Sequence, residues 1–571
     1  MKKLLLLIFL FSFSFCEGQS WVWAVQSKNL KYNSNVDPIS IATDKSGNIY
    51  ETGGFQDTVV FGLDTLMSDP SNGGMYLAKY SPNGNLIWIR SYSATLYNFL
   101  SPWYASCDSR NNVFLTGSFM GNVTLGSVNL STGFNEDAFI IKLDSNGTTL
   151  WGKSATINNT NYMAVSNSIA VDDSGNAFIV GDFYGTIYFG LDTLINKHPG
   201  DQSAFLVKYS ASGIPQWAKY SKSFKATYVF GNSVAIDKMN NIYLTGTFYD
   251  TLSFDSITTI NRKDYDIYLT KFSPYGKTLW LEAGTLNGYQ SLVFNNNCNP
   301  FVAVDSSNNI YVSATYQDTI SFGSILLKTD TNIHELANFL VKYSQNGLPV
   351  WALSTSSNGS FYGTMTIDNQ NNIYWSGTCG YFPFRLAGLS LNDTGSGAQS
   401  YIVKMDSNGH GLCGLAIDNA NDDENPVLLD PLTYDIYFSG DSHVGDYLVF
   451  GTDTITNYSS IGEYGFLTKL KLCNNIIITS NNISNSISSS LSLFPNPNSG
   501  AFTIQVESEK YKVESVEVYN MMGEKVYSST YSLSTNHYSL DLSSQPSGVY
   551  LYRVMDKSGA LVGEGKFVIQ K

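Results

Sequence analysis

The sequence predicts an all-β fold in which a seven-bladed β-propeller is followed by a small immunoglobulin-like β-sandwich. Three observations lead to this prediction. One unit recurs seven times, its apolar runs are short and separated by Gly- and Asn-containing turns, and no stretch keeps the roughly 3.6-residue apolar period of an amphipathic helix. One such sheet cannot bury both of its faces alone, whereas seven sheets arranged radially can.

Each unit is anchored by an aspartate that ends a short apolar run. The seven anchors are Asp44, Asp108, Asp172, Asp237, Asp305, Asp368 and Asp430, spaced 62 to 68 residues apart. An aspartate before a turn such as Ser-Gly-Asn accepts hydrogen bonds from the N–H groups of that turn, so we expect a structural role for these residues. The alternative is a ring of carboxylates that binds a cation.

The third and fourth strands of a unit carry a lysine and a tryptophan. The lysines are Lys79, Lys142, Lys208, Lys271, Lys342, Lys404 and Lys469, and the tryptophans are Trp88, Trp151, Trp217, Trp280 and Trp351. We expect each lysine to pair with the anchor aspartate or to reach the neighbouring unit. Cys413 replaces the tryptophan in the sixth unit, and the seventh unit lacks the fourth strand. The Trp23 segment is predicted to supply that strand and close the ring.

Extra length between the second and third runs of most units predicts an additional hairpin in each blade. The chain then divides into four segments. Residues 1–18 are predicted to be a signal peptide, because two lysines precede an apolar core that is too short to span a bilayer; lipid modification of Cys16 is the alternative. Residues 19–473 form the propeller, the Ser- and Asn-rich residues 474–492 a linker, and residues 493–571 the sandwich. No transmembrane segment is predicted.

Four motifs follow one another in the last segment. They contain Pro495, Asn496, Pro497 and Gly500, then Gly523, then Gly548 and Tyr550, and finally Lys566. In this order they resemble the C-terminal sorting domain of the type IX secretion system of Bacteroidetes. The resemblance implies that the type IX machinery is a partner. It also implies a secreted or outer-membrane cell-surface location, often with removal of the domain.

The string from Asp44 to Gly53 resembles bacterial β-propeller repeats of the type Asp-x-x-Gly-Asn-Ile-Tyr-x-Thr-Gly. This resemblance covers about residues 21 to 473. It implies the fold and no particular activity, since propellers host unrelated functions.

Composition and motifs predict no cofactor. A net charge of −14 argues against a nucleic-acid partner. The histidines His198, His334, His410, His443 and His537 show no metal-ligand spacing. Cys107, Cys298, Cys379, Cys413 and Cys473 are irregularly spaced, which favours buried thiols, with one bridge between late units as the alternative. The acidic loop Asp418–Glu424 is expected to be a solvated insertion, with Ca²⁺ binding as the alternative.

The leading functional prediction is non-catalytic binding or adhesion to an extracellular polysaccharide or protein. The alternatives are a carbohydrate-active enzyme with its site in the propeller channel and a structural component of a surface assembly. Outside the repeated aspartates we identify no carboxylate pair of the kind that a glycosidase needs. Aromatic residues outside the repeat, such as Trp103–Tyr104, Phe361–Tyr362 and Tyr381–Phe384, are candidates for a binding surface.

Overall fold

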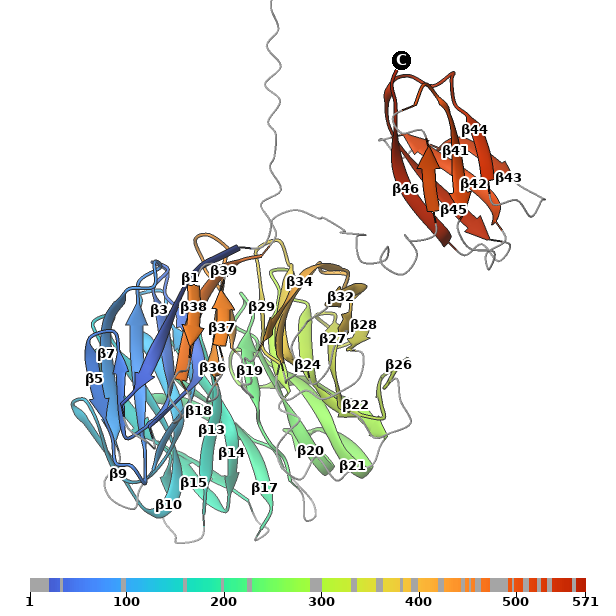
Figure 1. Cartoon of the computed structure of the whole chain (residues 1–571). Helices are drawn as coiled ribbons and strands as arrows, with labels where there is room; N and C mark the ends of the chain where they lie inside the picture. Colours follow the sequence, from blue (N-terminus) through green and yellow to red (C-terminus); the bar gives the residue numbers. More distant parts are fainter. Residues whose placement is uncertain are drawn as a thin grey trace, which may run out of the picture. The chain divides into compact units, whose positions relative to one another are not determined.

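The computed structural model contains two compact units, Met1–Ile477 and Ile478–Lys571 (Figure 1). The structure describes residues 20–30, 34–93, 99–157, 162–196, 200–222, 228–287, 300–329, 336–355, 363–379, 384–391, 399–418, 426–442, 447–450, 453–456, 464–472, 491–494, 498–506, 513–520, 525–530, 537–556 and 561–571. All regular secondary structure in these ranges is strand, which confirms the all-β prediction. The predicted signal peptide and nearly all of the predicted linker lie outside them. In the described ranges no helix is long and apolar enough to cross a membrane.

In the described residues of the first unit we distinguish seven groups of four antiparallel strands, which we number as sheets 1 to 7; two of these groups continue into six-stranded sheets. Sheet 1 is β2 (Asn35–Thr43), β3 (Ile49–Gln56), β6 (Gly74–Tyr80) and β7 (Leu86–Ser93). Sheet 2 is β8 (Leu100–Cys107), β9 (Val113–Leu125), β10 (Val128–Leu143) and β11 (Thr149–Ser154). Sheet 3 is β13 (Ala164–Val171), β14 (Ala177–Tyr184), β17 (Gln202–Tyr209) and β18 (Pro215–Tyr220).

The later sheets repeat this order. Sheet 4 is β19 (Ser233–Ile236), β20 (Ile242–Phe254), β21 (Ile257–Phe272) and β22 (Thr278–Asn287). Sheet 5 is β23 (Phe301–Val304), β24 (Ile310–Gln317), β27 (Leu336–Tyr343) and β28 (Pro349–Ser354). Sheet 6 is β29 (Met365–Ile367), β30 (Ile373–Cys379), β33 (Gln399–Met405) and β34 (Gly411–Asp418). Sheet 7 is β35 (Val427–Leu429), β36 (Ile436–Ser442), β39 (Tyr464–Lys471) and β1 (Ser20–Asn29).

The core of the first unit lies between successive sheets rather than within any one of them. Seven hydrophobic clusters each combine side chains of two neighbouring sheets, and one of them joins sheet 7 to sheet 1. The first strands follow the same sequence of contacts, from β2 to β8 and onward to β35, which in turn contacts β2. At the contact of sheets 7 and 1, Ser439 Oγ donates a hydrogen bond of 2.5 Å to the buried Glu51 carboxylate.

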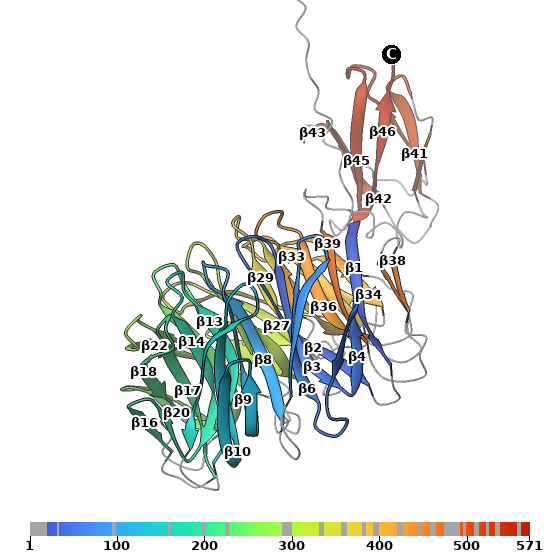
Figure 2. The same ribbon diagram turned by 90° about the vertical axis from the view of Figure 1, so that its left-hand side faces the viewer.

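The N-terminal strand β1 completes sheet 7, as the position of Trp23 predicts. It pairs antiparallel with β39, and Trp23 lies opposite Lys469 in the register. Figure 1 shows β1, in dark blue, beside the orange strands of the last repeat, and Figure 2 shows it close to β4. Because β39 would otherwise be an edge strand, this pairing satisfies backbone groups that would be open to another chain.

The predicted extra hairpins are present. Some of them pair with the outer strand of the preceding sheet instead of extending the sheet of their own repeat. β4 (Thr58–Phe61) and β5 (Asp64–Met67) continue from β1 of sheet 7, and β25 (Thr319–Phe322) and β26 (Ile325–Lys328) continue from β22 of sheet 4. The remaining short elements are β12 (Thr156–Ile157) with β15 (Thr186–Phe189) and β16 (Asp192–Ile195), β31 (Phe384–Leu386) with β32 (Leu389–Leu391), and β37 (Tyr447–Phe450) with β38 (Asp453–Thr456). A hairpin therefore extends the outer strand of the preceding sheet in the first and fifth repeats.

The second unit consists of two antiparallel sheets around one core. One sheet is β40 (Leu491–Phe494), β41 (Ala501–Val506) and β44 (His537–Asp541). The other is β43 (Lys525–Thr530), β42 (Val513–Asn520), β45 (Gly548–Asp556) and β46 (Leu561–Ile569). Phe502 and Tyr538 of the first sheet share a buried cluster with Val516 and Phe567 of the second.

Candidate functional site

The anchor aspartates are buried and act as acceptors for the turns that follow them. Asp44 Oδ1 accepts from the backbone N–H groups of Ser46 and Asn48 at 2.9 and 3.0 Å. Its Oδ2 accepts from the Asn48 amide at 2.9 Å and lies 3.3 Å from the Tyr50 hydroxyl. Turn N–H groups bond to the other six anchors in the same way, and all seven are at most 7% exposed. Their lone pairs are therefore engaged by the chain itself.

The repeated lysine approaches the anchor aspartate in three sheets. The Nζ–carboxylate distances are 3.6 Å for Lys79–Asp44, 2.9 Å for Lys142–Asp108 and 2.5 Å for Lys469–Asp430. Burial opposes ionisation of Asp430, but the hydrogen bonds that it accepts outweigh this effect and its pKa lies below the usual value. A lysine also lies over an aromatic ring in each sheet, as Lys79 does at 4.9 Å from the Tyr50 centroid.

In sheets 1, 2 and 5 the lysine and the tryptophan together bond to a turn of the next sheet. Lys79 Nζ and Trp88 Nε1 donate to the same carbonyl oxygen, that of Ser145 in sheet 2, at 2.9 and 3.1 Å. Trp23 repeats the contact from sheet 7 to sheet 1, where its indole N–H donates to the Pro82 carbonyl at 3.1 Å. The turn glycine is required here, because Gly84 has φ +79° and a Cβ would lie 2.7 Å from the Trp23 ring. These repeated polar residues therefore serve to connect neighbouring sheets. Space for a ligand is found elsewhere, between sheets 2 and 3.

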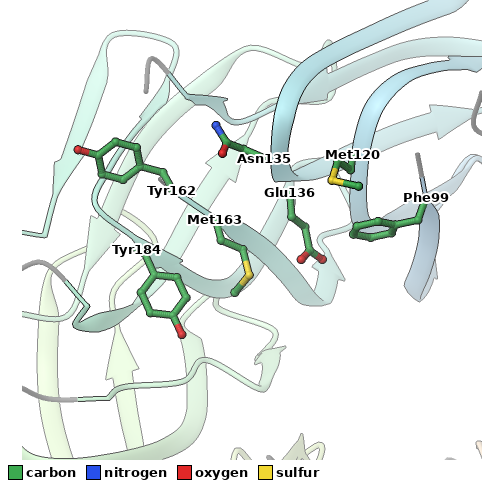
Figure 3. A pocket seen from close by; sticks show the side chains of 7 residues that line it. All are labelled: Phe99, Met120, Asn135, Glu136, Tyr162, Met163 and Tyr184. Carbon is green, nitrogen blue, oxygen red and sulfur yellow. The ribbon is translucent and has the colours of Figure 1, made fainter. Parts of the chain in front are cut away.

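A cavity of about 350 Å³ lies between sheets 2 and 3 (Figure 3). It is lined by Phe99, Met120, Asn135, Glu136, Tyr162, Met163 and Tyr184. Met120 lies in β9, Asn135 and Glu136 lie in β10 and Tyr184 ends β14, whereas the other three residues directly precede β8 or β13. Its size falls within the range of about 300–1,000 Å³ that is typical of small-molecule sites, and apolar lining with few polar groups is also typical.

The local backbone explains why these side chains meet. The N–H of Met120 bonds to the Phe99 carbonyl and the N–H of Tyr184 bonds to the Met163 carbonyl, both at 2.9 Å, so each wall is an antiparallel strand pair. Glu136 stands opposite Met120 in the register of β10 and β9. Gly185 has φ +74°, and a Cβ there would lie 1.4 Å from the Tyr162 ring, so only glycine allows Tyr162 this position.

Three carboxyl groups lie in this part of sheets 2 and 3. Burial raises the pKa of Glu136, which lines the cavity. Asp182 is buried, accepts hydrogen bonds from the Asn167 amide at 2.9 Å and from the Gln202 amide, and has a pKa raised by burial to about 7. Burial likewise raises the pKa of Asp137 to about 8, and its Oδ1 has no hydrogen-bond partner. Comparison of the repeats does not identify these three carboxyl groups, because most other repeats have different residues at the three positions.

The sorting-motif residues that the structure describes lie in the second unit. Gly500 has φ +111°, and a Cβ would lie 2.5 Å from the Ser543 Cα. Tyr550 donates its hydroxyl to the Pro546 carbonyl at 2.9 Å and stacks on Phe567 at 5.7 Å. Gly548 pairs with Ile569 at the start of β45, and Lys566 is exposed on β46. Pro495, Asn496, Pro497 and Gly523 lie outside the described residues.

The cysteine, histidine and aromatic candidates that the structure describes do not come together in one site. Cys413 is disulfide-bonded, which corrects the expectation of a buried thiol there; oxidising surroundings outside the cell favour such a bond. Cys107 is free. Residues 419–425 of the acidic loop lie outside the described ranges, and within those ranges no group of three or more His, Cys, Asp or Glu residues could hold a metal ion. His410 lies 3.1 Å from Asp406 on an exposed turn. Of the out-of-repeat aromatics, Tyr104 lies 6.4 Å from Phe301, centroid to centroid.

These features define the class: an exported, β-rich repeat protein that carries a sorting domain. Residues 492–570 match the family model of the secretion system C-terminal sorting domain. The chain is therefore directed through the type IX secretion system to the cell surface or the extracellular space, and the secretion machinery is a partner.

Sequence and structure comparisons add relatives of the first unit. The chain is 24% identical over 449 residues to an uncharacterized WD repeat-containing protein of Acanthamoeba polyphaga mimivirus, covering 64% of this chain and 31% of the relative. It thus spans less than a third of that protein. A Dyadobacter fermentans protein of unknown function is 9% identical with a TM-score of 0.35, covering 80% of this chain and 99% of that one. An ulvan lyase of polysaccharide lyase family 25 is 10% identical, also with a TM-score of 0.35, covering 76% and 97%. At these TM-scores neither structure transfers a function to this chain.

Proposed function

We propose that the protein is a non-catalytic binding protein of the cell surface or extracellular space. In this proposal the seven sheets form one closed seven-bladed β-propeller, and the cavity between sheets 2 and 3 contacts a polysaccharide or protein ligand. The cavity carries the proposal, because it combines apolar walls with two polar side chains, Asn135 and Glu136, in an exported chain. The cyclic order of the seven intersheet clusters supports the closed propeller.

Two observations argue against the alternative of an enzyme with its active site in the propeller channel. Tyr104 belongs to sheet 2 and Phe301 to sheet 5, yet their rings are 6.4 Å apart. In a closed propeller built on these first strands, the two rings would occupy the middle of the channel. Glu136 and Asp182 form the most notable acidic pair outside the anchors, but Asp182 is buried and held by two amides. A glycosidase needs both carboxyl groups at the scissile bond.

The test uses the purified full chain on a panel of polysaccharides and glycoproteins, with binding and product release recorded together. Tyr184→Ala should weaken capture of a bound panel member. Tyr249→Ala is the matched control, since Tyr249 has the same repeat position in sheet 4 and is 37% exposed. Binding without turnover that depends on Tyr184 supports the proposal. Turnover of any member would replace it with the enzyme, and no binding at all would favour a structural component of a surface assembly.

A further inference from the structure

The lining of the cavity has a definite chemical bias. Five of its seven residues present aromatic rings or thioethers, one presents an amide and one a carboxylate, and none is basic. Figure 3 shows the Glu136 carboxylate between Met163 on one side and Phe99 with Met120 on the other. The cavity is largely open to solvent, and among the residues that line it no cation accompanies the Glu136 carboxylate, as one usually accompanies a partly buried charge.

The neighbouring acid does not compete for the same ligand. Asp182 lies close enough for its charge and that of Glu136 to disfavour each other. Its oxygens already accept from Asn167 and Gln202, and Gln202 in turn accepts from the Tyr184 hydroxyl at 3.0 Å. The network fixes the Tyr184 ring, and Glu136 supplies the carboxylate that lines the cavity.

We propose that the cavity binds a protonated amine, with the ammonium group at Glu136 and Asn135 and its carbon stem between Met120, Met163 and the tyrosine rings. Charge-assisted hydrogen bonds and aromatic faces both favour an organic cation over a neutral group of the same shape. Thioethers adapt to an aliphatic stem. This inference rests on the proposed function of the cavity as a binding site. A lysine side chain and an amino sugar both present this chemistry.

Calorimetric titration of the full chain at pH 8 tests the inference with n-pentylamine and its neutral counterpart 1-pentanol. We expect the amine to bind at least tenfold more tightly than the alcohol, since hydrogen bonds between charged groups are stronger than those of a neutral hydroxyl. Glu136→Gln should weaken amine binding on the order of tenfold. Glu282→Gln is the matched control, because Glu282 is also a partly buried carboxyl with a raised pKa, on β22 in sheet 4.

Two further experiments identify the source of the amine and distinguish failure of the amine inference from failure of the proposed binding function. Nα-acetyl-lysine methylamide and glucosamine are each compared with their amine-acetylated forms, and the tighter binder names the source. Should Glu136→Gln not fold, Asn135→Asp replaces it and is expected to tighten amine binding. Equal affinity for amine and alcohol, or equal effects of the Glu136 and Glu282 variants, would overturn the inference. If Tyr184→Ala abolishes capture of a panel ligand that amines do not displace, only the amine inference fails.

Discussion

Glu51 makes the stability of the first unit depend on pH. Its place in the repeat is taken by Leu115, Ile179, Leu244 and Val312 in sheets 2 to 5, yet Glu51 is 3% exposed. Burial raises its pKa from 4.5 to about 7, although the hydrogen bond from Ser439 partly opposes the effect. The carboxyl group is therefore held in its neutral form at the contact of sheets 7 and 1.

The sign and size of the effect follow from linkage. The native state retains the Glu51 proton up to about pH 7, whereas the unfolded chain loses it near pH 4.5. The contribution of Glu51 to stability is therefore fully present below pH 4.5 and is lost as the pH rises to 7. At about 1.36 kcal/mol per pKa unit, the loss attributable to Glu51 is about 3 kcal/mol.

The assay is urea unfolding of the wild type and Glu51→Gln at pH 5 and pH 8, followed by tryptophan fluorescence. All nine tryptophans lie between Trp21 and Trp375, so the signal reports on the first unit alone. Asp137 and Asp182 also titrate in this range and affect both proteins equally. The wild type should lose about 2–3 kcal/mol more than the variant between the two pH values. Equal losses in both proteins would refute the reasoning.

Three other substitutions test contacts within the first unit and within the second. Trp23→Ala should lower the unfolding free energy of the first unit by about 2–4 kcal/mol by removing the ring beside Gly84, measured by urea denaturation; an unchanged midpoint would contradict the role of β1. Asp430→Asn should cost about 3 kcal/mol because it removes the carboxylate 2.5 Å from the buried Lys469 ammonium and leaves only Asp435 at 3.5 Å, whereas the same change at exposed Asp173 should cost little by the same measurement. Phe567→Ala should destabilise the second unit by about 3–5 kcal/mol in far-ultraviolet circular dichroism without moving the tryptophan transition, and a shift in that transition would show that the units are coupled.

The repeat and its turns could be predicted because their determinants are local. An aspartate, a Gly or Asn at positive φ and an alternating apolar run each act within a few residues, as at Asp44 and Gly47. The lysine and tryptophan contacts were less predictable. Lys79 and Trp88 bond to Ser145, a residue of the next repeat, and spacing within one repeat does not specify that partner.

The cavity could not be predicted from the sequence, because its determinants are not local. Its residues depart from the repeat instead of following it, and they come from two neighbouring repeats. Met120 and Tyr184 share one repeat position, but Asn135 lies within β10 and Tyr162 lies in the connection before β13. Of the out-of-repeat aromatics that the structure describes, Trp103 and Tyr104 do not line it, whereas Phe361, Tyr362 and Tyr381 lie outside the described residues. A search for charged residues at positions that are uncharged in most other repeats, such as Glu136, would have given a signal.

Completion of sheet 7 by β1 sets the order of events in folding. The Thr468 hydroxyl donates to the Trp23 carbonyl across a separation of 445 residues. Contacts between such distant residues carry a large loop-closure cost and form late. Strand β1 therefore cannot complete its pairing before β39 has formed, and until β1 docks, β39 presents an unpaired edge. A chain that ends before Tyr464 lacks β39 and leaves β36 with an open edge that is vulnerable to proteolysis, whereas pairing of β39 with β36 and β1 removes that edge.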